Sequence, residues 1–199
     1  MYDTVNMWLP FNSLGNFDMS QTIKSLSRIT EYIHEDGQVG LSGYLQNYRV
    51  NVSENGLSLK GSLAKYYLSN NFNTLTRSDS KTAIEKMSDE LSLPIKIAKV
   101  NRIDFAHNFQ MDYAPEAYYN FLGESQYYNR QPQSNSLYYS NHSRQKLFYN
   151  KTAEAKANGV TPPCSGLGKN ILRYEMRFKT RLSKQFNQAE VKANSLTEE

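Results

Sequence analysis

Apolar residues occur with two different periods along the chain, and the order of these periods predicts the order of the elements. In residues 2–9 apolar and polar residues alternate, which is typical of a strand, whereas in residues 19–34 the apolar residues recur every three or four positions, which is typical of a helix. From residue 39 to residue 68 the period returns to two. An Asn55-Gly56 pair between two alternating runs there predicts a tight β-hairpin.

The second part of the chain repeats this mixture of periods. Residues 78–94 combine Ser and Asp caps with apolar residues on one helical face and end at a proline, so they predict an amphipathic helix. The same signals then predict a strand at 95–111, a helix beginning at Pro115, a hairpin at 136–151, a short helix at 152–158 and a strand at 171–182. Mixed helices and strands with adjacent hairpins favour an α+β fold with a mainly antiparallel central sheet and flanking helices.

This organisation predicts one main domain over residues 1–184. Residues 185–199 look like the beginning of a helical segment that has nothing after it to pack on. We therefore expect the chain to be part of a longer protein.

Charge and aromatic content indicate a nucleic-acid partner. The net charge is +4 with a pI of about 9.0, and residues 140–184 hold ten Lys and Arg against two acidic residues. The 15 Tyr and 9 Phe offer flat faces on which bases can stack. The chain has a single Cys, no leader-like N-terminus and no run of about 18 apolar residues, so we expect a cytoplasmic protein that does not enter a membrane.

The few histidines narrow the chemistry. The three His residues lack the spacing of a zinc site, a Ser-His-Asp triad or a paired-histidine nuclease, and no glycine-rich phosphate loop follows a strand. The remaining candidates for catalysis are carboxylates on predicted strands that are rich in Lys and Arg. Alternation in residues 102–108 puts Asp104 on one face with Arg102 and Asn108, and His107 on the other.

A second strand carries the other carboxylate. Alternation places Glu175 on one face together with Arg173, Arg177 and Lys179. Oxygen ligands from two strands suit Mg²⁺ or Mn²⁺, and beside such an ion the hydroxyl of Tyr149 could attack a phosphodiester. The residues alone leave other interpretations open: Asp104 and Glu175 as ion-pair partners, Tyr149 as a half-buried strand residue, and His107 as a core histidine near the proposed metal.

Three segments carry a resemblance to a known family. "NRIDFAHNF", "SLYYSNHSRQKLFYNKTAEAK" and "ILRYEMRFKTRL" resemble the three-motif core of rolling-circle replication initiators, namely the Rep_trans proteins of small plasmids and the phage and plasmid replication proteins of the gene II/X family. The earlier "GLSLKGSLAKYYLSNNFNTLTRSD" is similar to a block of the gene II/X-like proteins. The resemblance covers residues 39–182.

The resemblance assigns roles to individual residues. Tyr149 matches the family's nucleophile, and Asp104 and Glu175 match its metal-ligating acidic residues. Lys151 matches the lysine that follows the tyrosine; we expect it on the same strand face, where it would stabilise the phenolate or the phosphate. Plasmid members often have a second carboxylate after the first motif, where this chain has His107 and Asn108, so either residue or water would complete the metal shell.

The resemblance implies an initiator endonuclease whose catalytic domain is residues 1–184. It would nick one strand at an origin with Mg²⁺ or Mn²⁺, form a 5′-phosphotyrosine link and free a 3′-OH primer. The implied partners are single-stranded or hairpin origin DNA, a host helicase and a DNA polymerase, and the resemblance leaves room for a homodimer. The candidates for phosphate contacts are Arg102, Arg144, Lys146, Arg173, Arg177 and Lys179, and those for base stacking are Tyr138, Tyr139 and Phe148.

Two other functions fit the same residues. A non-catalytic origin-binding regulator on this scaffold would bind DNA with the same salt sensitivity but would be indifferent to the loss of the Tyr149 hydroxyl. A single-stranded RNA-binding module would use the aromatic and basic surface without metal and would prefer RNA to matched DNA.

Overall fold

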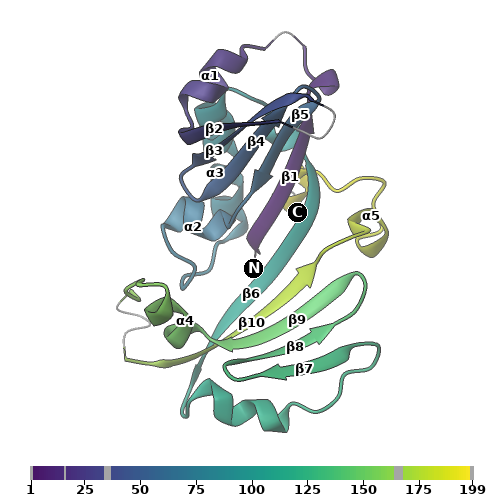
Figure 1. Ribbon diagram of the computed structural model, residues 1–199. Helices are drawn as coiled ribbons and strands as arrows, with labels where there is room; N and C mark the ends of the chain where they lie inside the picture. The colour runs from purple at the N-terminus through teal and green to yellow at the C-terminus, as the bar shows by residue number, and fades with distance from the viewer. Residues whose placement is uncertain (1, 16, 34–36, 164–167, 198–199) are drawn as a thin grey trace.

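Ten strands form a single sheet in which every neighbouring pair is antiparallel (Figure 1), in a computed structural model that describes residues 2–15, 17–33, 37–163 and 168–197. The order across the sheet is β2-β3-β4-β5-β1-β6-β10-β9-β8-β7. The strands are β1 (Tyr2–Pro10), β2 (Ser27–Ile33), β3 (Val39–Leu45), β4 (Tyr48–Ser53), β5 (Gly56–Lys60), β6 (Lys99–Met111), β7 (Asn129–Gln133), β8 (Ser136–Ser140), β9 (Arg144–Asn150) and β10 (Asn170–Phe178). This sheet confirms the predicted α+β class.

Short helices connect and flank the strands. They are α1 (Met19–Lys24), α2 (Leu63–Leu68), α3 (Arg77–Leu91), α4 (Lys151–Ala157) and α5 (Leu182–Gln185), with 3-10 turns η1 (Phe11–Ser13), η2 (Ile95–Ile97), η3 (Pro115–Phe121) and η4 (Ala193–Leu196). The 13-residue strand β6 joins two halves of the sheet, because it pairs with β1 along its first part and with β10 from Ile103 to Met111.

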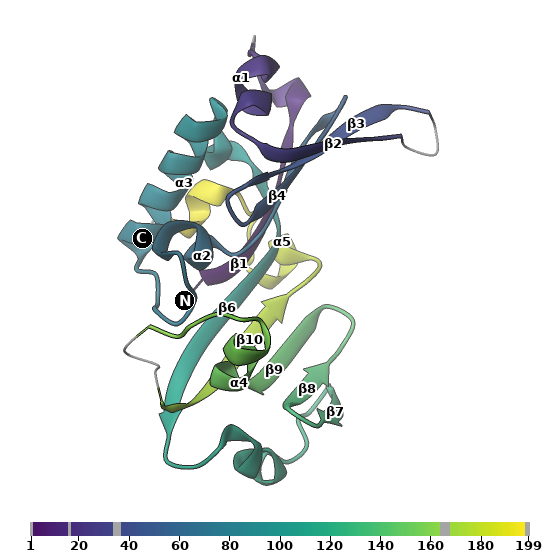
Figure 2. The same ribbon diagram turned by 60° about the vertical axis from the view of Figure 1, so that its left-hand side comes forward.

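The main core lies between the β1–β5 half of the sheet and the helices on one of its faces (Figure 2). In β1, alternate residues such as Val5, Met7 and Leu9 are fully buried in this core. A smaller cluster under the other half contains Tyr119, Leu137, Tyr139 and Leu172. Two register shifts in the β1–β6 ladder bend the sheet where these halves meet.

The prediction of a helix over residues 19–34 is wrong in its second half. The helix α1 ends at Lys24, and β2 then forms the edge of the sheet; the last predicted residue, His34, lies outside the described residues. Ile29 and Ile33 match a helical spacing, but they are β-branched and exposed on the edge strand. Spacing alone could not separate the two states over so short a run.

Two further elements differ from the predictions. Residues 63–68 were expected to continue a sheet but form α2, because the side chain of Ser62 accepts a hydrogen bond from the Lys65 amide at 3.2 Å and caps the helix. The edge strand β7 was not predicted: its sequence NRQPQ is polar and contains a proline, which an edge strand tolerates.

The C-terminal segment packs on the body of the protein. Val191, Ala193 and Leu196 are buried in the main core, and the Val100 amide donates to the Val191 carbonyl at 2.8 Å. Residues 185–199 were expected to begin a helix with nothing to pack on. Up to residue 197 this is not what the structure shows, because α5 and η4 are short and η4 contacts α3; residues 198 and 199 lie outside the described residues.

The predicted amphipathic helix is confirmed as α3, and its first turn offers a test. The Asp79 amide donates to Thr76 Oγ1 at 3.0 Å while the Thr76 amide donates to Asp79 Oδ2 at 2.8 Å, so the two residues cap the helix reciprocally. We expect Thr76→Ala to lower the free energy of unfolding by about 1 kcal/mol, measured by urea denaturation. Thr82→Ala, in the exposed middle of α3, should be close to neutral; equal losses in both variants would contradict the capping role.

Candidate active site

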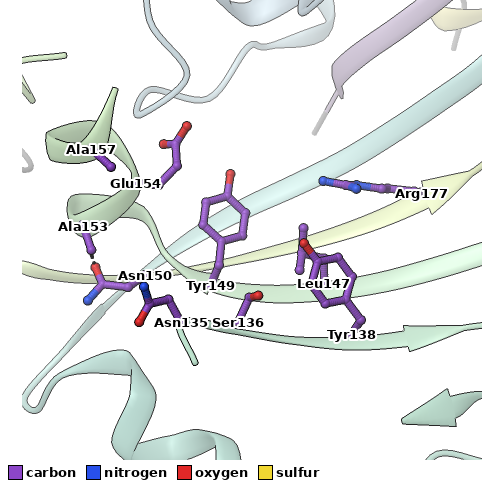
Figure 3. Close-up of a pocket in the computed structure, with 10 residues that line it drawn as sticks. All are labelled: Asn135, Ser136, Tyr138, Leu147, Tyr149, Asn150, Ala153, Glu154, Ala157 and Arg177. Carbon is purple, nitrogen blue, oxygen red and sulfur yellow. Dashed lines mark hydrogen bonds between the residues drawn. The ribbon is translucent and has the colours of Figure 1, made fainter. Parts of the chain in front are cut away.

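Tyr149 lies near the end of β9, and its side chain projects from the face of the sheet into an open cavity (Figure 3). The cavity holds about 370 Å³ and lies between α4 and the strands β8, β9 and β10. Directly across from Tyr149 in the β9–β10 ladder is Arg173, and the Tyr149 hydroxyl donates a hydrogen bond to Glu175 Oε1 at 2.9 Å. The predicted nucleophile and one predicted acidic residue are thus in direct contact.

Glu175 is surrounded by cations. Its Oε1 accepts from Arg173 Nε at 2.8 Å, and its Oε2 accepts from Arg177 Nε at 3.0 Å and Nη2 at 2.7 Å. Burial raises the pKa of Glu175, but the charges and hydrogen bonds of the two arginines more than offset this and lower its pKa to about 2. The carboxylate is therefore ionised at neutral pH and fixed in position beside the phenol.

The phenol itself is held in its protonated form. Burial raises the pKa of Tyr149, and the negative charge of Glu175 raises it further. Attack by Tyr149 on a phosphate thus requires that its proton leave during the reaction, and Glu175 Oε1 is the acceptor already bonded to that proton.

The depressed pKa of Glu175 predicts a pH dependence of stability. A carboxyl group whose pKa falls from 4.5 when unfolded to about 2 when folded stabilises the protein above pH 4.5, by on the order of 3 kcal/mol, and this contribution is lost as the pH drops toward 2. We expect the free energy of unfolding of the wild type to fall more steeply over this range than that of Glu175→Gln. Glu85→Gln, at an exposed position of α3, should keep the wild-type slope; parallel profiles for Glu175→Gln and wild type would contradict the assignment.

Arg173 connects Glu175 to three other parts of the protein. Its Nη2 donates to Asp3 Oδ2 of β1 at 2.5 Å, and its Nη1 donates to the Asn71 carbonyl at 2.7 Å and to Asn108 Oδ1 at 3.2 Å. Only 2% of Arg173 is exposed. It is thus a buried connecting residue, and this placement does not fit the predicted phosphate contact.

Sequence reasoning missed Asp3. Its carboxylate also accepts from Ser62 Oγ at 2.6 Å, and the residue is buried. The available signal was that Asp3 interrupts the apolar positions of the alternating pattern in β1, where an isolated carboxylate needs a cation partner.

The second predicted acidic residue, Asp104, is also paired with arginine. Arg102 Nε and Nη2 donate to its two oxygens at 2.9 and 2.7 Å, and Arg177 Nε lies 3.8 Å from Oδ2. Burial raises the pKa of Asp104, and the bonds from Arg102 oppose that rise. Arg177 therefore lies between the two acidic residues that the sequence singled out.

The predicted metal shell of Asp104, Glu175, His107 and Asn108 is brought together only in part: Asp104 and Glu175 share Arg177, and Asn108 Oδ1 accepts from Arg173 Nη1 at 3.2 Å. His107 is exposed on the opposite face of β6 with its ring 4.6 Å from that of Phe109. The amide nitrogen of Asn108 donates to the carbonyls of Asn71 and Phe72 at 3.3 and 2.8 Å, and so anchors the loop before α3.

Charge balance also disfavours a divalent ion in this arrangement. The carboxylates of Asp3, Asp104 and Glu175 face the guanidinium groups of Arg102, Arg173 and Arg177 in matching number. Among the residues that the structure describes, no group of three or more His, Cys, Asp or Glu side chains could hold a metal ion. The residues as placed do not fit Mg²⁺ or Mn²⁺, because an ion would have to displace guanidinium groups.

Lys151 is not on the strand with Tyr149, and that part of its prediction is wrong. It is the first residue of α4, because the Asn150 side chain accepts from the Ala153 amide and starts the helix there. Its ammonium group is buried, donates to Glu154 Oε2 at 2.6 Å and lies 5.2 Å from the centroid of the Phe72 ring. Burial lowers the pKa of Lys151, and Glu154 opposes that change.

The remaining basic candidates divide between the two faces of the sheet. Arg144 and Lys146 pair with Phe178 and Met176, so they lie on the face opposite Tyr149. There Arg144 donates to Gln185 and lies 5.2 Å from the Phe178 ring centroid, while Lys146 donates to Ser125 Oγ at 3.0 Å. On the face of Tyr149, Arg177 lines the cavity; Lys179, just after β10, makes no side-chain hydrogen bond or ion pair within the described chain.

The aromatic candidates divide in the same way. Tyr138 lines the cavity of Tyr149. Tyr139 points to the other face, where it is 3% exposed and its hydroxyl donates to the carbonyls of Leu122 and Gly123 at 2.9 and 2.6 Å, and Phe148 packs against it. Only Tyr138 of these three is therefore placed to stack with a base at the cavity.

The model of one protein family, Phage_CRI, which describes the N-terminal part of a phage replication-associated protein, matches residues 1–197. The chain belongs to this family of phage replication-associated proteins. This membership confirms the resemblance to gene II/X replication proteins and supports a role in initiating phage DNA replication. No curated protein matches the chain. Within the described residues, no helix is both long and apolar enough to cross a membrane.

Proposed function

We propose that the protein nicks one strand of an origin by transesterification through Tyr149. The observation that carries this proposal is the hydrogen bond from the Tyr149 hydroxyl to the ionised Glu175, made at the wall of an open cavity. The phenolic oxygen attacks phosphorus in line, its proton passes to Glu175 Oε1, and the bond from phosphorus to the 3′ oxygen breaks. The products are a 5′-phosphotyrosine link and, after the leaving oxygen takes a proton from water, a free 3′-OH.

Arg177 is suited to stabilise the charge that develops on the phosphate. It lines the cavity of Tyr149, is 23% exposed in its side chain and is fixed by Glu175 and by a bond from its Nη1 to Gln145 Oε1 at 3.1 Å. A guanidinium group that is already oriented needs little reorganisation when charge appears in the transition state. Glu175 thus has two roles in this proposal: it accepts the proton and it holds Arg177 in place.

The substrate in this proposal is unpaired DNA, single-stranded or in the loop of an extruded hairpin. Tyr149 is half-buried between α4 and the strands, so a phosphate reaches its hydroxyl only if the strand can bend into the cavity, which a duplex backbone does not do readily. The freed 3′-OH would prime synthesis by a host polymerase behind a host helicase. The link conserves the energy of the broken bond, so the strand could be rejoined without ATP.

The proposed step does not use two features that the family resemblance implies, a metal cofactor and a homodimer, and experiments must test them. The family resemblance implies Mg²⁺ or Mn²⁺ as a cofactor, but the proposed step uses no metal because arginines already pair with the acidic residues. A homodimer is likewise an expectation that the proposed step does not need.

Incubation with labelled single-stranded oligonucleotides that tile the origin region, with Mg²⁺, with Mn²⁺ and with EDTA, tests the function. The proposal predicts cleavage at one position and a covalent protein–DNA product on the 5′ side of the cut. Cleavage in EDTA would show that the arginine-held site acts without a divalent ion. Tight DNA binding without cleavage under all three conditions would favour the non-catalytic regulator, and preference for RNA over matched DNA would favour the RNA-binding module.

A further inference from the structure

The β1–β5 half of the sheet has one face without a covering helix among the described residues (Figures 1 and 2). Alternate residues of β1 and β4 are buried under the helices, and the residues between them are half-buried or exposed. Polar and basic residues dominate these uncovered positions, so the face is suited to a polar partner.

One cross-strand row on this face is cationic and aromatic. Tyr44 pairs with Arg49, and Arg49 pairs with Lys60, so the three side chains project side by side. All three are exposed. Apart from the Arg49 Nε bond to Ser42 Oγ at 3.2 Å, the described chain provides no side-chain hydrogen bond or ion pair for the two cations.

The neighbouring row contains the single tryptophan of the chain. Trp8 pairs with Lys99 in the β1–β6 ladder. The backbone of Lys99 in turn forms an isolated antiparallel β-bridge with that of Lys192 in the C-terminal segment. The indole lies so close over Gly56 that a Cβ there would stand 2.5 Å from the ring, and a glycine at this position allows the flat approach.

A cavity of about 280 Å³ lies beside Trp8 and is lined by Lys99, Lys192 and Glu190. Glu190 lies 3.3 Å from Lys99 and 3.7 Å from Lys192, so one carboxylate is shared by two ammonium groups and the cavity keeps a positive excess. The Trp8 ring offers a face on which a base can stack, and Lys99 and Lys192 beside it in the cavity offer cations for phosphate contacts.

The face is continuous with the candidate active site. Asn6 pairs with Arg102, which binds Asp104, and Asp104 lies 3.8 Å from Arg177 at the cavity of Tyr149. A polymer bound along the two rows would therefore be led toward Tyr149.

We propose that this face binds single-stranded DNA. Arg49, Lys60, Lys99 and Lys192 contact phosphates, and a base stacks on Trp8 in the adjoining cavity. The choice of a single strand follows from the flat aromatic faces of Trp8 and Tyr44, which a base can reach only when it is unpaired. The proposal rests on the proposed function only in that the bound strand continues to the cavity of Tyr149.

The fluorescence of Trp8 reports on this face directly because the chain has no other tryptophan. Titration of the wild-type protein with an oligothymidylate of about ten nucleotides should quench this fluorescence in a saturable way. We expect Lys60→Ala and Lys99→Ala each to weaken binding by about three- to tenfold and to reduce the slope of log affinity against log salt by about 0.7. Lys81→Ala, on the exposed side of α3 over the other face, is the matched control and should leave both unchanged.

The outcomes separate this proposal from the nicking proposal. Anisotropy of a labelled oligonucleotide measures binding independently of Trp8. If it shows binding while Trp8 fluorescence does not change and Lys60→Ala and Lys99→Ala keep wild-type affinity, the proposal that this face binds DNA is wrong, and the nicking proposal is unaffected. Saturable quenching without cleavage would support DNA binding by this face and contradict the nicking proposal. Stronger binding of duplex DNA, or of matched RNA, than of the single DNA strand would overturn the face proposal as stated.

Discussion

We expect replacement of Tyr149 by phenylalanine to lower the rate of the proposed strand cleavage by at least about 10³-fold. The change removes the attacking oxygen but keeps the ring that forms part of the cavity wall. Glu175 loses one donor and keeps its three bonds from Arg173 and Arg177, so the fold and the binding of DNA should persist. Rates are measured on the oligonucleotide that the wild type cuts, and folding is checked by thermal unfolding.

Tyr138→Phe is the matched control because Tyr138 lines the same cavity on the neighbouring strand β8. It removes a hydroxyl that makes no hydrogen bond within the described residues, and its cleavage rate should stay within about threefold of wild type. Equal losses in the two variants would show that the cavity needs its polar surface in general, and cleavage by Tyr149→Phe at the wild-type rate would exclude Tyr149 as the nucleophile.

The second large effect concerns stability. We expect Arg173→Met to lower the free energy of unfolding by about 3–5 kcal/mol, because it leaves the buried carboxylates of Asp3 and Glu175 without their shared cation. The same change removes the donor to the Asn71 carbonyl and so loosens the loop before α3. Urea denaturation with a two-state fit gives the difference.

Arg49→Met provides the comparison for this change, since Arg49 is exposed on β4 and the same substitution there should alter stability by no more than about 0.5 kcal/mol. Arg173→Met with wild-type stability would contradict the role of Arg173 as the residue that connects β1, β10 and the loop. Asp3→Asn should fall between the two, because it weakens only one of the bonds of Arg173.

Alternation along single strands predicted the local part of the site. A period of two correctly placed Asp104 with Arg102 and Glu175 with Arg173 and Arg177, because side-chain direction in a strand depends only on position. The same period contains the information that Arg144 and Lys146 face away from Tyr149. The count of Lys and Arg over residues 140–184 does not use this period, so it assigned the cations of both sheet faces to one basic surface.

The contacts between distant segments were outside the reach of these patterns. Asp3 and Asn71 reach Arg173 only because β1 and the loop before α3 come together around β6 and β10 in the folded sheet. Within the predicted metal shell, His107 and Asn108 are close to Asp104 in sequence, yet His107 projects from the other face and Asn108 binds the loop. Whether a carboxylate faces a metal or an arginine depends on these tertiary contacts.

Identification of the residue that carries the DNA tests the proposed nicking mechanism most directly. The covalent product of wild-type protein and its oligonucleotide is digested with a protease, and the modified peptide is sequenced by mass spectrometry. We expect a nucleotide joined through its 5′ phosphate to Tyr149. A nucleotide joined to another residue, or cleavage that leaves a free 5′ phosphate and no modified peptide, would contradict it.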